Sequence, residues 1–189
     1  MSHAVCPWWV GYLLVSPLRR LIQDPARVLA PHVSEGMTVL EPGPGMGFFT
    51  LELARRVGPR GRVVAVDLQP RMLAGLRRRA ARAGLHDRIE LRLARPDALG
   101  VDDLAGQVDL VLAFAVVHEL PDAARFFAEV APLLKPDGRV LVAEPAGHVP
   151  PADFEASLAA AGLAGLQALT GPGRGPTIAR SLTALLARG

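Results

Sequence analysis

Apolar runs typical of buried strands alternate with helix-like segments through the middle of this chain, and this alternation constrains the fold more than any other feature. The segments predicted as strands are residues 37–41, 62–67, 88–94, 108–117 and 138–144, and those predicted as helices are 48–57, 70–84 and 122–134. The run "VDLVLAFAVV" is almost continuously apolar, as a strand covered on both faces is. Strands separated by helices predict a parallel sheet with helices on both sides.

The C-terminal part of the chain has a different pattern. Residues 150–162 predict a helix. Two short apolar runs follow, at 163–170 and 181–188, and the Gly- and Pro-rich "GPGRGPTIAR" joins them. A turn-rich joint between two late strands predicts a hairpin.

The N-terminal segment, residues 1–35, precedes the first predicted strand and is expected to form helices. One of them should begin with Asp24 as its N-cap and Pro25 as its first residue, since these residue types favour those positions. No linker follows this segment, so we expect a single domain over residues 1–189.

Composition and charge exclude several classes of protein. Of the 189 residues 50% are hydrophobic and 21% charged, which is typical of a globular domain. The net charge of +3 is too small for a nucleic-acid footprint, and the run "RRRAAR" (77–82) is better explained as the solvated face of an amphipathic helix than as a basic patch. No aromatic side chains interleave with these arginines to stack on bases.

The ends and the single cysteine bear on location. The first fifteen residues lack the positive n-region of a signal peptide, and no run reaches the roughly 20 apolar residues that a spanning helix needs. Cys6 alone excludes an internal disulfide and a multi-cysteine metal site. We therefore expect a cytoplasmic protein without a metal site, and neither a membrane nor a nucleic acid as its partner.

A glycine-rich stretch, "EPGPGMG" (41–47), follows the first predicted strand, at the edge where open parallel sheets bind their ligands. It does not fit the dinucleotide pattern G-x-G-x-x-G, because the sixth position counted from Gly43 is Phe48. It is not a phosphate-binding P-loop either, since no Gly-Lys-Ser/Thr follows. Ordering glycine is costly, so three of them here indicate a backbone that comes close to a ligand.

The spacing E-x-G-x-G-x-G from Glu41 to Gly47 resembles the class I S-adenosylmethionine-dependent methyltransferases. Three further landmarks agree in order: Asp67 at the end of the second strand, Asp97 after the third, and "LLKPDGRVLVAE" (133–144) before and within the fifth. Together they span residues 37–145. The resemblance implies a Rossmann-like α/β fold with a seven-stranded, mostly parallel sheet that ends in an antiparallel hairpin, and S-adenosylmethionine as cofactor with S-adenosylhomocysteine as product.

The resemblance also implies roles for individual residues. Glu41 would hold the amino group of the cofactor, Asp67 the two ribose hydroxyls and Asp97 the adenine amino group. The full set implied to contact the cofactor is Glu41, Gly43, Pro44, Gly45, Gly47, Asp67, Leu68, Gln69, Asp97, Ala98 and Phe114. Pro44 departs from the family, which often has Gly or Cys there, and it stiffens the turn while removing an amide donor.

The end of the fourth strand, "LAFAVVHELPD" (112–122), is where residues that contact the methyl acceptor are expected. Related enzymes that methylate exocyclic amines of bases often carry Asn/Asp-Pro-Pro-aromatic here, whereas this chain has Phe-Ala-Val-Val at 114–117. This difference favours a small-molecule acceptor. His118 is the candidate catalytic base. The alternative is that it only hydrogen-bonds backbone and lines the pocket, and Glu119 is expected to face solvent or an arginine.

Three aromatic side chains near the N-terminus, Trp8, Trp9 and Tyr12, are candidates for the acceptor pocket. In related small-molecule methyltransferases an N-terminal helix closes over this pocket, so we interpret residues 1–35 as a lid, with core packing of these rings as the alternative. A second subunit, as in a homodimer, is the other source of a cap. Arsenite methylation needs several thiols, so the single Cys6 disfavours it.

Two other functions stay open at this stage. The chain could be a cofactor-binding regulatory subunit without transferase activity, or an RNA-modifying methyltransferase that needs a partner protein. The sequence does not determine whether oxygen, nitrogen or carbon receives the methyl group, because one fold supports all three chemistries.

Overall fold

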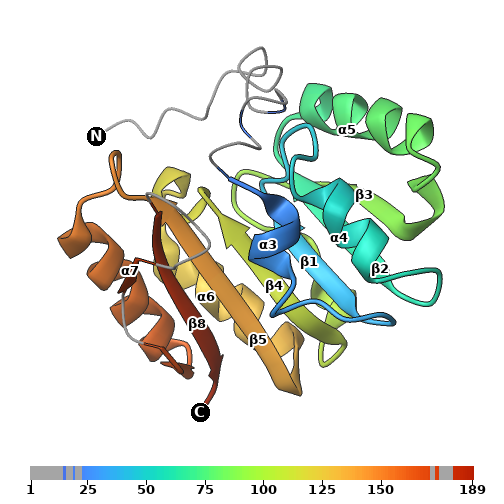
Figure 1. Ribbon diagram of the computed structural model, residues 1–189. Coiled ribbons are helices and arrows are strands. Elements are labelled where there is room, and N and C mark those ends of the chain that lie inside the picture. The colour runs from blue at the N-terminus through green and yellow to red at the C-terminus, as the bar shows by residue number, and fades with distance from the viewer. Residues whose placement is uncertain (1–14, 16–18, 20–22, 171–172, 175–180) are drawn as a thin grey trace. The chain divides into compact units, whose positions relative to one another are not determined.

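The computed structural model describes residues 15, 19, 23–170, 173–174 and 181–189 (Figure 1). Cys6, Trp8, Trp9 and Tyr12 lie outside these residues. The chain divides into two compact units, one ending at Gly100 and one with Val101–Gly189 as its main part. We call them the first and the second unit, and the single domain expected over the whole chain stays a prediction.

The first unit contains three parallel strands in the order β3-β2-β1. Its elements are α3 (Pro25–Leu29), β1 (Thr38–Pro42), α4 (Thr50–Arg56), β2 (Arg62–Asp67), α5 (Pro70–Arg82), the 3₁₀ helix η1 (His86–Arg88) and β3 (Ile89–Leu93). All three predicted strands and both predicted helices are present, with ends that shift by up to two residues. The register pairs Glu41 with Ala65 and Asp67 with Leu93. The two acidic residues therefore lie near the carboxyl ends of neighbouring strands.

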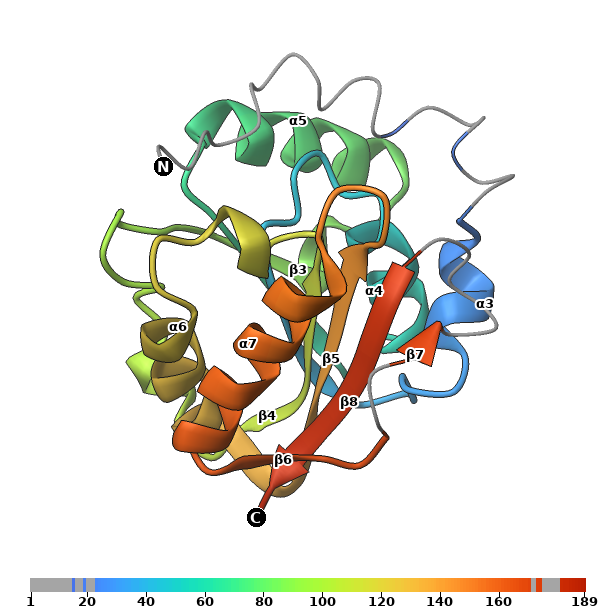
Figure 2. The ribbon, with the colours of Figure 1, turned by 90° about the vertical axis from the view of Figure 1, so that its left-hand side faces the viewer.

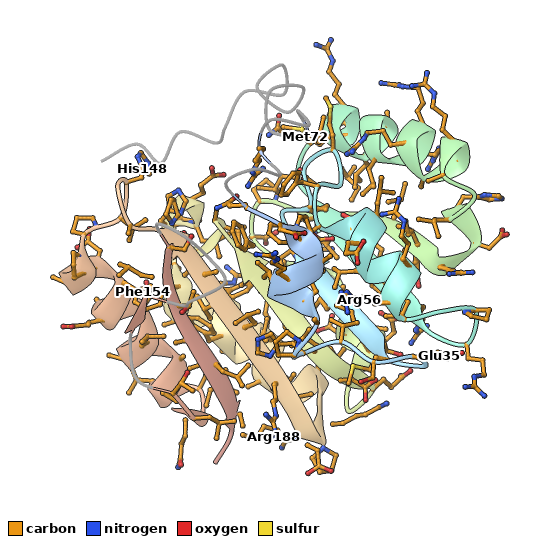
Figure 3. All side chains as sticks on the ribbon, in the orientation of Figure 1. Glu35, Arg56, Met72, His148, Phe154 and Arg188 are labelled. Carbon is orange, nitrogen blue, oxygen red and sulfur yellow. The ribbon has the colours of Figure 1, made fainter. Side chains whose placement is uncertain are left out.

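The short helix α3 begins as predicted. Asp24 is its N-cap, with Oδ1 accepting a hydrogen bond from the Ala26 amide at 3.0 Å, and Pro25 is its first residue. Arg56 of α4, labelled in Figure 3, donates from Nη2 to the Ala26 carbonyl at 2.7 Å. This bond ties α3 to α4, which lies in front of β1 and β2 in Figure 1.

Helix α5 has the predicted amphipathic pattern. Met72, Leu73, Leu76 and Ala80 are buried, while Arg77, Arg78 and Arg82 are exposed, so the solvated face predicted for the arginine run is confirmed for these three. Arg79 is different, because it is only partly exposed and its Nη1 donates to the Met46 carbonyl. One arginine of the run therefore supports the glycine-rich turn.

The second unit contains four strands in the order β4-β5-β8-β6, and a two-residue strand, β7, also pairs with β8. Its elements are η2 (Asp102–Leu104), β4 (Val108–Phe114), η3 (Val117–Glu119), α6 (Ala123–Val130), η4 (Ala131–Leu133), β5 (Leu134–Pro145), α7 (Pro151–Leu163), β6 (Leu166–Ala168), β7 (Gly173–Arg174) and β8 (Ser181–Arg188). β4 and β5 are parallel, whereas β8 is antiparallel to both β5 and β6. The two late strands predicted to pair as a hairpin do pair.

Helices α6 and α7 lie on the same side of these strands (Figure 2). Phe127 of α6 and Phe154 of α7 are fully buried, and Figure 3 shows Phe154 between α7 and the strands. Asp122 caps α6, with Oδ1 accepting from the Arg125 amide at 3.0 Å. The helix predicted over 122–134 ends earlier, at Val130, because the chain tightens into η4, which contains Pro132.

Two strand ends differ from the sequence prediction for local reasons. β4 stops at Phe114, three residues before the predicted end, because Ala115 adopts a left-handed φ of 52°. β5 begins at Leu134 and includes Gly138, which the sequence suggested as a turn residue. A Cβ at position 138 would lie 2.7 Å from the Val108 carbonyl, so this close approach between strands requires glycine.

No helix among the described residues is both long enough and apolar enough to cross a membrane.

Candidate functional site

The glycine-rich turn after β1 has a left-handed backbone at each predicted glycine. The φ angles of Gly43, Gly45 and Gly47 are 65°, 55° and 85°. Backbone hydrogen bonds fix the turn at both ends, from the Gly43 amide to the Val66 carbonyl at 2.8 Å and from the Gly47 amide to the Pro44 carbonyl at 2.9 Å. Glycine adopts these angles without the steric cost that other residues incur, so the sequence pattern is explained by the backbone.

The two later glycines have different surroundings. A Cβ added at Gly47 would overlap Leu76 Cδ1 of α5, whereas a Cβ added at Gly45 would meet nothing within 4 Å. Met46, between them, is buried at 3% exposure against Gly75 of α5. The turn therefore packs on α5 through Met46 and Gly47, and at Gly45 it leaves open space beside the backbone that a ligand can occupy.

Asp67 connects the end of β2 to this turn. Its Oδ2 accepts a hydrogen bond from the Gly45 amide at 3.2 Å, and its Oδ1 accepts one from the Gln69 amide at 2.8 Å. The residue is 8% exposed. The next residue, Leu68, is 38% exposed. Leu93, which pairs with Asp67 in the register of β2 and β3, is 60% exposed. A fixed carboxylate beside exposed apolar side chains suits a ligand with hydroxyl groups and a flat apolar ring.

Glu41 is buried at the end of β1, and burial raises its pKa to about 8. The side chain of Thr50 lowers the pKa of Glu41 somewhat, and the negative charge of Asp67 raises it. Thr50 lies nearby, yet neither Glu41 Oε2 nor Thr50 Oγ1 has a partner with hydrogen-bond geometry among the described residues. Buried polar atoms are normally satisfied. An ammonium group would supply both the charge and the donors, so Glu41 fits the amino end of an amino-acid-like ligand.

The remaining predicted residues of the first unit are more exposed. Asp97 lies in a tight turn in which Arg95 and Ala98 form an isolated bridge, and its side chain is 65% exposed. Its carboxylate is 3.6 Å from Arg95 Nε. The role of Asp97 toward adenine stays a prediction, as does the contact of Ala98 with the cofactor.

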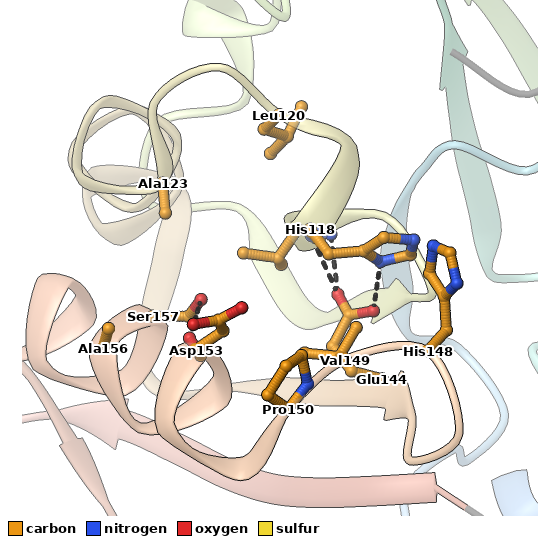
Figure 4. A pocket seen from close by; sticks show the side chains of 11 residues that line it. His118, Leu120, Ala123, Glu144, His148, Val149, Pro150, Asp153, Ala156 and Ser157 are labelled. Carbon is orange, nitrogen blue, oxygen red and sulfur yellow. Dashed lines mark hydrogen bonds and ion pairs between the residues drawn. The ribbon is translucent and has the colours of Figure 1, made fainter. Parts of the chain in front are cut away.

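In the second unit, the His118 ring is hydrogen-bonded to the Glu144 carboxylate. The Nδ1 atom of His118 lies 2.6 Å from Oε2 of Glu144, while Oε1 of the same carboxylate accepts from the Val117 amide at 2.8 Å and from the His118 amide at 3.3 Å (Figure 4). The hydrogen bond with Glu144 raises the pKa of His118 above its ordinary value, against the lowering effect of burial. The ring is also 5.2 Å from that of His148, in an edge-to-face arrangement.

This pair lines a pocket of about 400 Å³ at the carboxyl ends of β4 and β5. The pocket residues come from η3 and the residue after it, the start of α6, the end of β5, the loop after β5 and the first half of α7, namely Val117, His118, Leu120, Ala123, Glu144, His148, Val149, Pro150, Asp153, Ala156 and Ser157. Figure 4 shows His118 on one side of the pocket, with Asp153 and Ser157 on the side formed by α7. Six of the lining residues are apolar and five are polar or titratable, so the lining can contact an apolar surface and also orient polar groups of a small molecule.

Glu144 and His148 were not predicted as site residues from the sequence. A signal for Glu144 was available, because an acid at the carboxyl end of a buried strand is the same pattern that singled out Glu41 and Asp67. His148 lies in the loop after β5 and had no comparable signal. Phe114 is 9% exposed at the end of β4, and its contact with the cofactor stays a prediction.

Comparisons with known proteins bear on the family and the fold of this chain. A family model described as "Methyltransferase domain" matches residues 33–168. A solved structure, a SAM-dependent methyltransferase from Aquifex aeolicus, superposes with a TM-score of 0.80 at 25% identity and covers 97% of this chain and 98% of that one. It confirms the predicted Rossmann-like, mostly parallel sheet with antiparallel C-terminal strands.

Curated relatives are similar over part of the chain. An arsenite methyltransferase from Halobacterium salinarum is 34% identical over 112 residues, which is 59% of this chain and 28% of that protein. A nocamycin O-methyltransferase from Saccharothrix syringae is 35% identical over 116 residues, 61% of this chain and 39% of that protein. This chain thus spans well under half the length of both. The match of the family model over most of the chain, together with the fold, shows that the chain belongs to the class I methyltransferases that use S-adenosylmethionine as cofactor.

Proposed function

We propose that this chain transfers a methyl group from S-adenosylmethionine to a small-molecule acceptor. The observation that carries the proposal is the connected set of Gly45, Asp67 and the buried Glu41, which presents open backbone, a fixed carboxylate and unmet hydrogen-bonding capacity at the ends of two neighbouring strands. When bound, S-adenosylmethionine supplies a methyl group already activated by its sulfonium.

The residues of the chain then have distinct tasks. Glu41 holds the ammonium group, and Asp67 accepts hydrogen bonds from the ribose hydroxyls while it keeps the glycine turn in place. Leu68 and Leu93 offer exposed apolar surface beside Asp67 for the adenine ring. Much of the rate enhancement in such a transfer comes from holding the reactants in line.

A small organic acceptor is supported by the relatives and by the second-unit pocket. The two curated relatives are named for small-molecule acceptors, arsenite and nocamycin. Arsenic prefers soft thiolate ligands, and this chain has a single cysteine, so an organic acceptor is the better match. The pocket beside His118 has a volume of about 400 Å³, within the range of ligand sites. Trp8, Trp9 and Tyr12 of the N-terminal segment are proposed to cap the acceptor.

The test has two steps. Mass spectrometry of the purified protein should detect bound S-adenosylmethionine or S-adenosylhomocysteine. Cofactor carrying a labelled methyl group is then offered with a metabolite extract and, separately, with total RNA, using Asp67→Ala as the matched control. Label in a small organic product that depends on Asp67 supports the proposal, label in RNA favours a nucleic-acid modifier, and cofactor binding without any turnover favours a regulatory subunit.

A further inference from the structure

We infer that Glu144 is a positioning residue that holds His118 as the base for an acceptor hydroxyl, so that the methyl acceptor is a small compound with an ionisable hydroxyl group. This inference rests on the proposed function, which it deepens by naming the reacting atom.

The hydrogen bonds around Glu144 fix the tautomer of His118. Oε1 of Glu144 is engaged by the amides of Val117 and His118 at 2.8 and 3.3 Å, and Oε2 lies 2.6 Å from His118 Nδ1. A carboxylate only accepts, so Nδ1 must donate and carries a proton. The Glu144 side chain is 2% exposed, which leaves it little freedom to move. In neutral His118 the lone pair is therefore on Nε2.

Nε2 is in a position to accept a proton. It lies on the side of the ring turned away from Glu144 and makes no hydrogen bond within the part of the chain that the structure describes. The His118 side chain retains 19% of its exposure and lines the pocket. The pocket wall combines apolar residues such as Val117 and Leu120 with polar ones such as Asp153 and Ser157. A small compound that presents a hydroxyl to His118 suits this lining.

The proton-transfer step balances without a further reagent. His118 Nε2 would take the proton of the acceptor hydroxyl as its oxygen bonds to the methyl carbon that S-adenosylmethionine supplies, and the carbon–sulfur bond would break with its electron pair remaining on sulfur. The positive charge of the sulfonium would then be replaced by that of the His118 imidazolium, next to the Glu144 carboxylate. A neutral amine can attack with its own lone pair before losing a proton, so a fixed base contributes most when the acceptor is a hydroxyl.

Several charged or titratable groups face His118 and set its pH dependence. They are Glu144 from β5, Glu119 from the same 3₁₀ helix, His148 from the loop after β5, and Asp153 from α7, which lines the same pocket. The hydrogen bond with Glu144 is the largest influence on the pKa of His118 and raises it, and the charge of Glu119 adds to this. Activity should therefore fall as the pH drops through a midpoint above 6.5, the ordinary value.

The first test is nuclear magnetic resonance of the imidazole nitrogens, which needs neither cofactor nor turnover. Neutral His118 in the wild-type protein should be protonated on Nδ1. In Glu144→Gln, an amide oxygen that still accepts from the two backbone amides turns its NH₂ toward Nδ1, so the proton should move to Nε2 and the pKa should fall. Glu119→Gln is the control, because it removes a nearby charge and should leave the tautomer unchanged. Protonation on Nε2 in the neutral wild type would overturn the inference, whether or not the variant folds.

The second test compares a matched pair of probes, 2-naphthol and 2-naphthylamine. The wild type should methylate 2-naphthol in preference to the amine, and Glu144→Gln should lower kcat/KM by roughly 100-fold or more, the usual effect of general acid–base catalysis. Its pH midpoint should also shift downward, which a purely structural role would not cause. A rate within threefold of wild type, or preference for the amine, would contradict the inference.

Calorimetry with S-adenosylhomocysteine separates the two proposals. Failure of the wild type to bind it would refute the proposed function, whereas normal binding with an unaltered tautomer in Glu144→Gln would refute the role of Glu144 alone.

Discussion

Asp67 and Gly45 are joined by a hydrogen bond across 22 positions of sequence, from the Gly45 amide to Asp67 Oδ2 at 3.2 Å. The acid that the family resemblance assigned to the ribose hydroxyls thus also holds the turn assigned to the methionine part of the cofactor. Two contacts that the sequence suggested separately are parts of one hydrogen-bonded arrangement. Loss of the Asp67 carboxylate should therefore affect both the contact with the ribose and the position of the glycine-rich turn.

Asp67→Ala should weaken binding of S-adenosylhomocysteine at least tenfold. Hydrogen bonds to a charged group contribute about 1.5–3 kcal/mol each, and the loss of a single one already corresponds to more than a tenfold change in affinity. Isothermal titration calorimetry measures the effect. Asp87→Ala is the matched control, because the Asp87 side chain is 86% exposed in the same unit. Equal affinities of the two variants would remove Asp67 from the cofactor site.

Gly45→Val should abolish cofactor binding while the protein still folds. The added side chain would extend into the open space beside the turn, where a Cβ meets nothing within 4 Å. Gly36→Val is a close control, because Gly36 also has a positive φ, 86°, and open space around its Cβ. Both variants carry similar backbone strain, of about 1–2 kcal/mol. A binding defect shared equally by both would show that strain, and not contact with the ligand, is responsible.

Deleting residues 1–15 should leave cofactor affinity within about tenfold, or 1.4 kcal/mol, while methyl transfer is largely lost. The reason is that the proposed cap, with Trp8 and Trp9, contacts the acceptor and not the cofactor, and lids belong to the less stable parts of a fold. Calorimetry measures cofactor affinity, circular dichroism measures folding, and a transfer assay measures turnover. The double variant Trp8→Ala/Trp9→Ala keeps the chain length and should have the same effect. Unfolding would identify the tryptophans as core, and unchanged turnover would place the acceptor pocket elsewhere.

The elements of the fold were predictable because their signals are local. Continuous aliphatic runs such as "RVVAVD" are buried in parallel strands, and Asp24 and Pro25 begin a helix as their residue types favour. Strand and helix ends were less predictable where a single backbone conformation decides them. Ala115 ends β4 by adopting a left-handed conformation that is uncommon for residues other than glycine, and nothing in its neighbours indicates this.

Site residues at the ends of strands were predictable from the sequence. Contacts between residues on different strands were not. Glu41 and Asp67 were identified because they end strands, but the bond between Asp67 and Gly45 depends on the pairing of β1 with β2. Likewise His118 was identified as a lone polar residue. Its partner Glu144, 26 residues later, is brought to it only by the parallel pairing of β4 and β5. The position of Glu144 at a strand end marks it as a candidate by itself, but its pairing with His118 needs the register of the sheet, which no local pattern contains.

The burial of Glu41 has a consequence for stability that can be measured without ligand. Its pKa is about 8 in the folded protein and 4.5 ordinarily. Between these values the folded chain holds a proton at this position that the unfolded chain has lost. The free energy of unfolding therefore decreases as the pH rises from 4.5 toward 8, because the native state binds more protons than the unfolded state.

Glu41→Gln should remove this loss of stability at higher pH, because an amide does not ionise. The ligand-free variant should be more stable than the wild type at pH 8, by up to a few kcal/mol, and the difference should shrink toward pH 5. Urea unfolding at the two pH values measures it, with the exposed Glu155→Gln as a control whose effect should be small at both. The same variant should lose affinity for S-adenosylhomocysteine, since it no longer offers a charge to the ammonium group. A stability difference that is constant with pH would mean that Glu41 ionises alike in the folded and unfolded chain, and the case for a buried carboxylate waiting for an ammonium partner would fail.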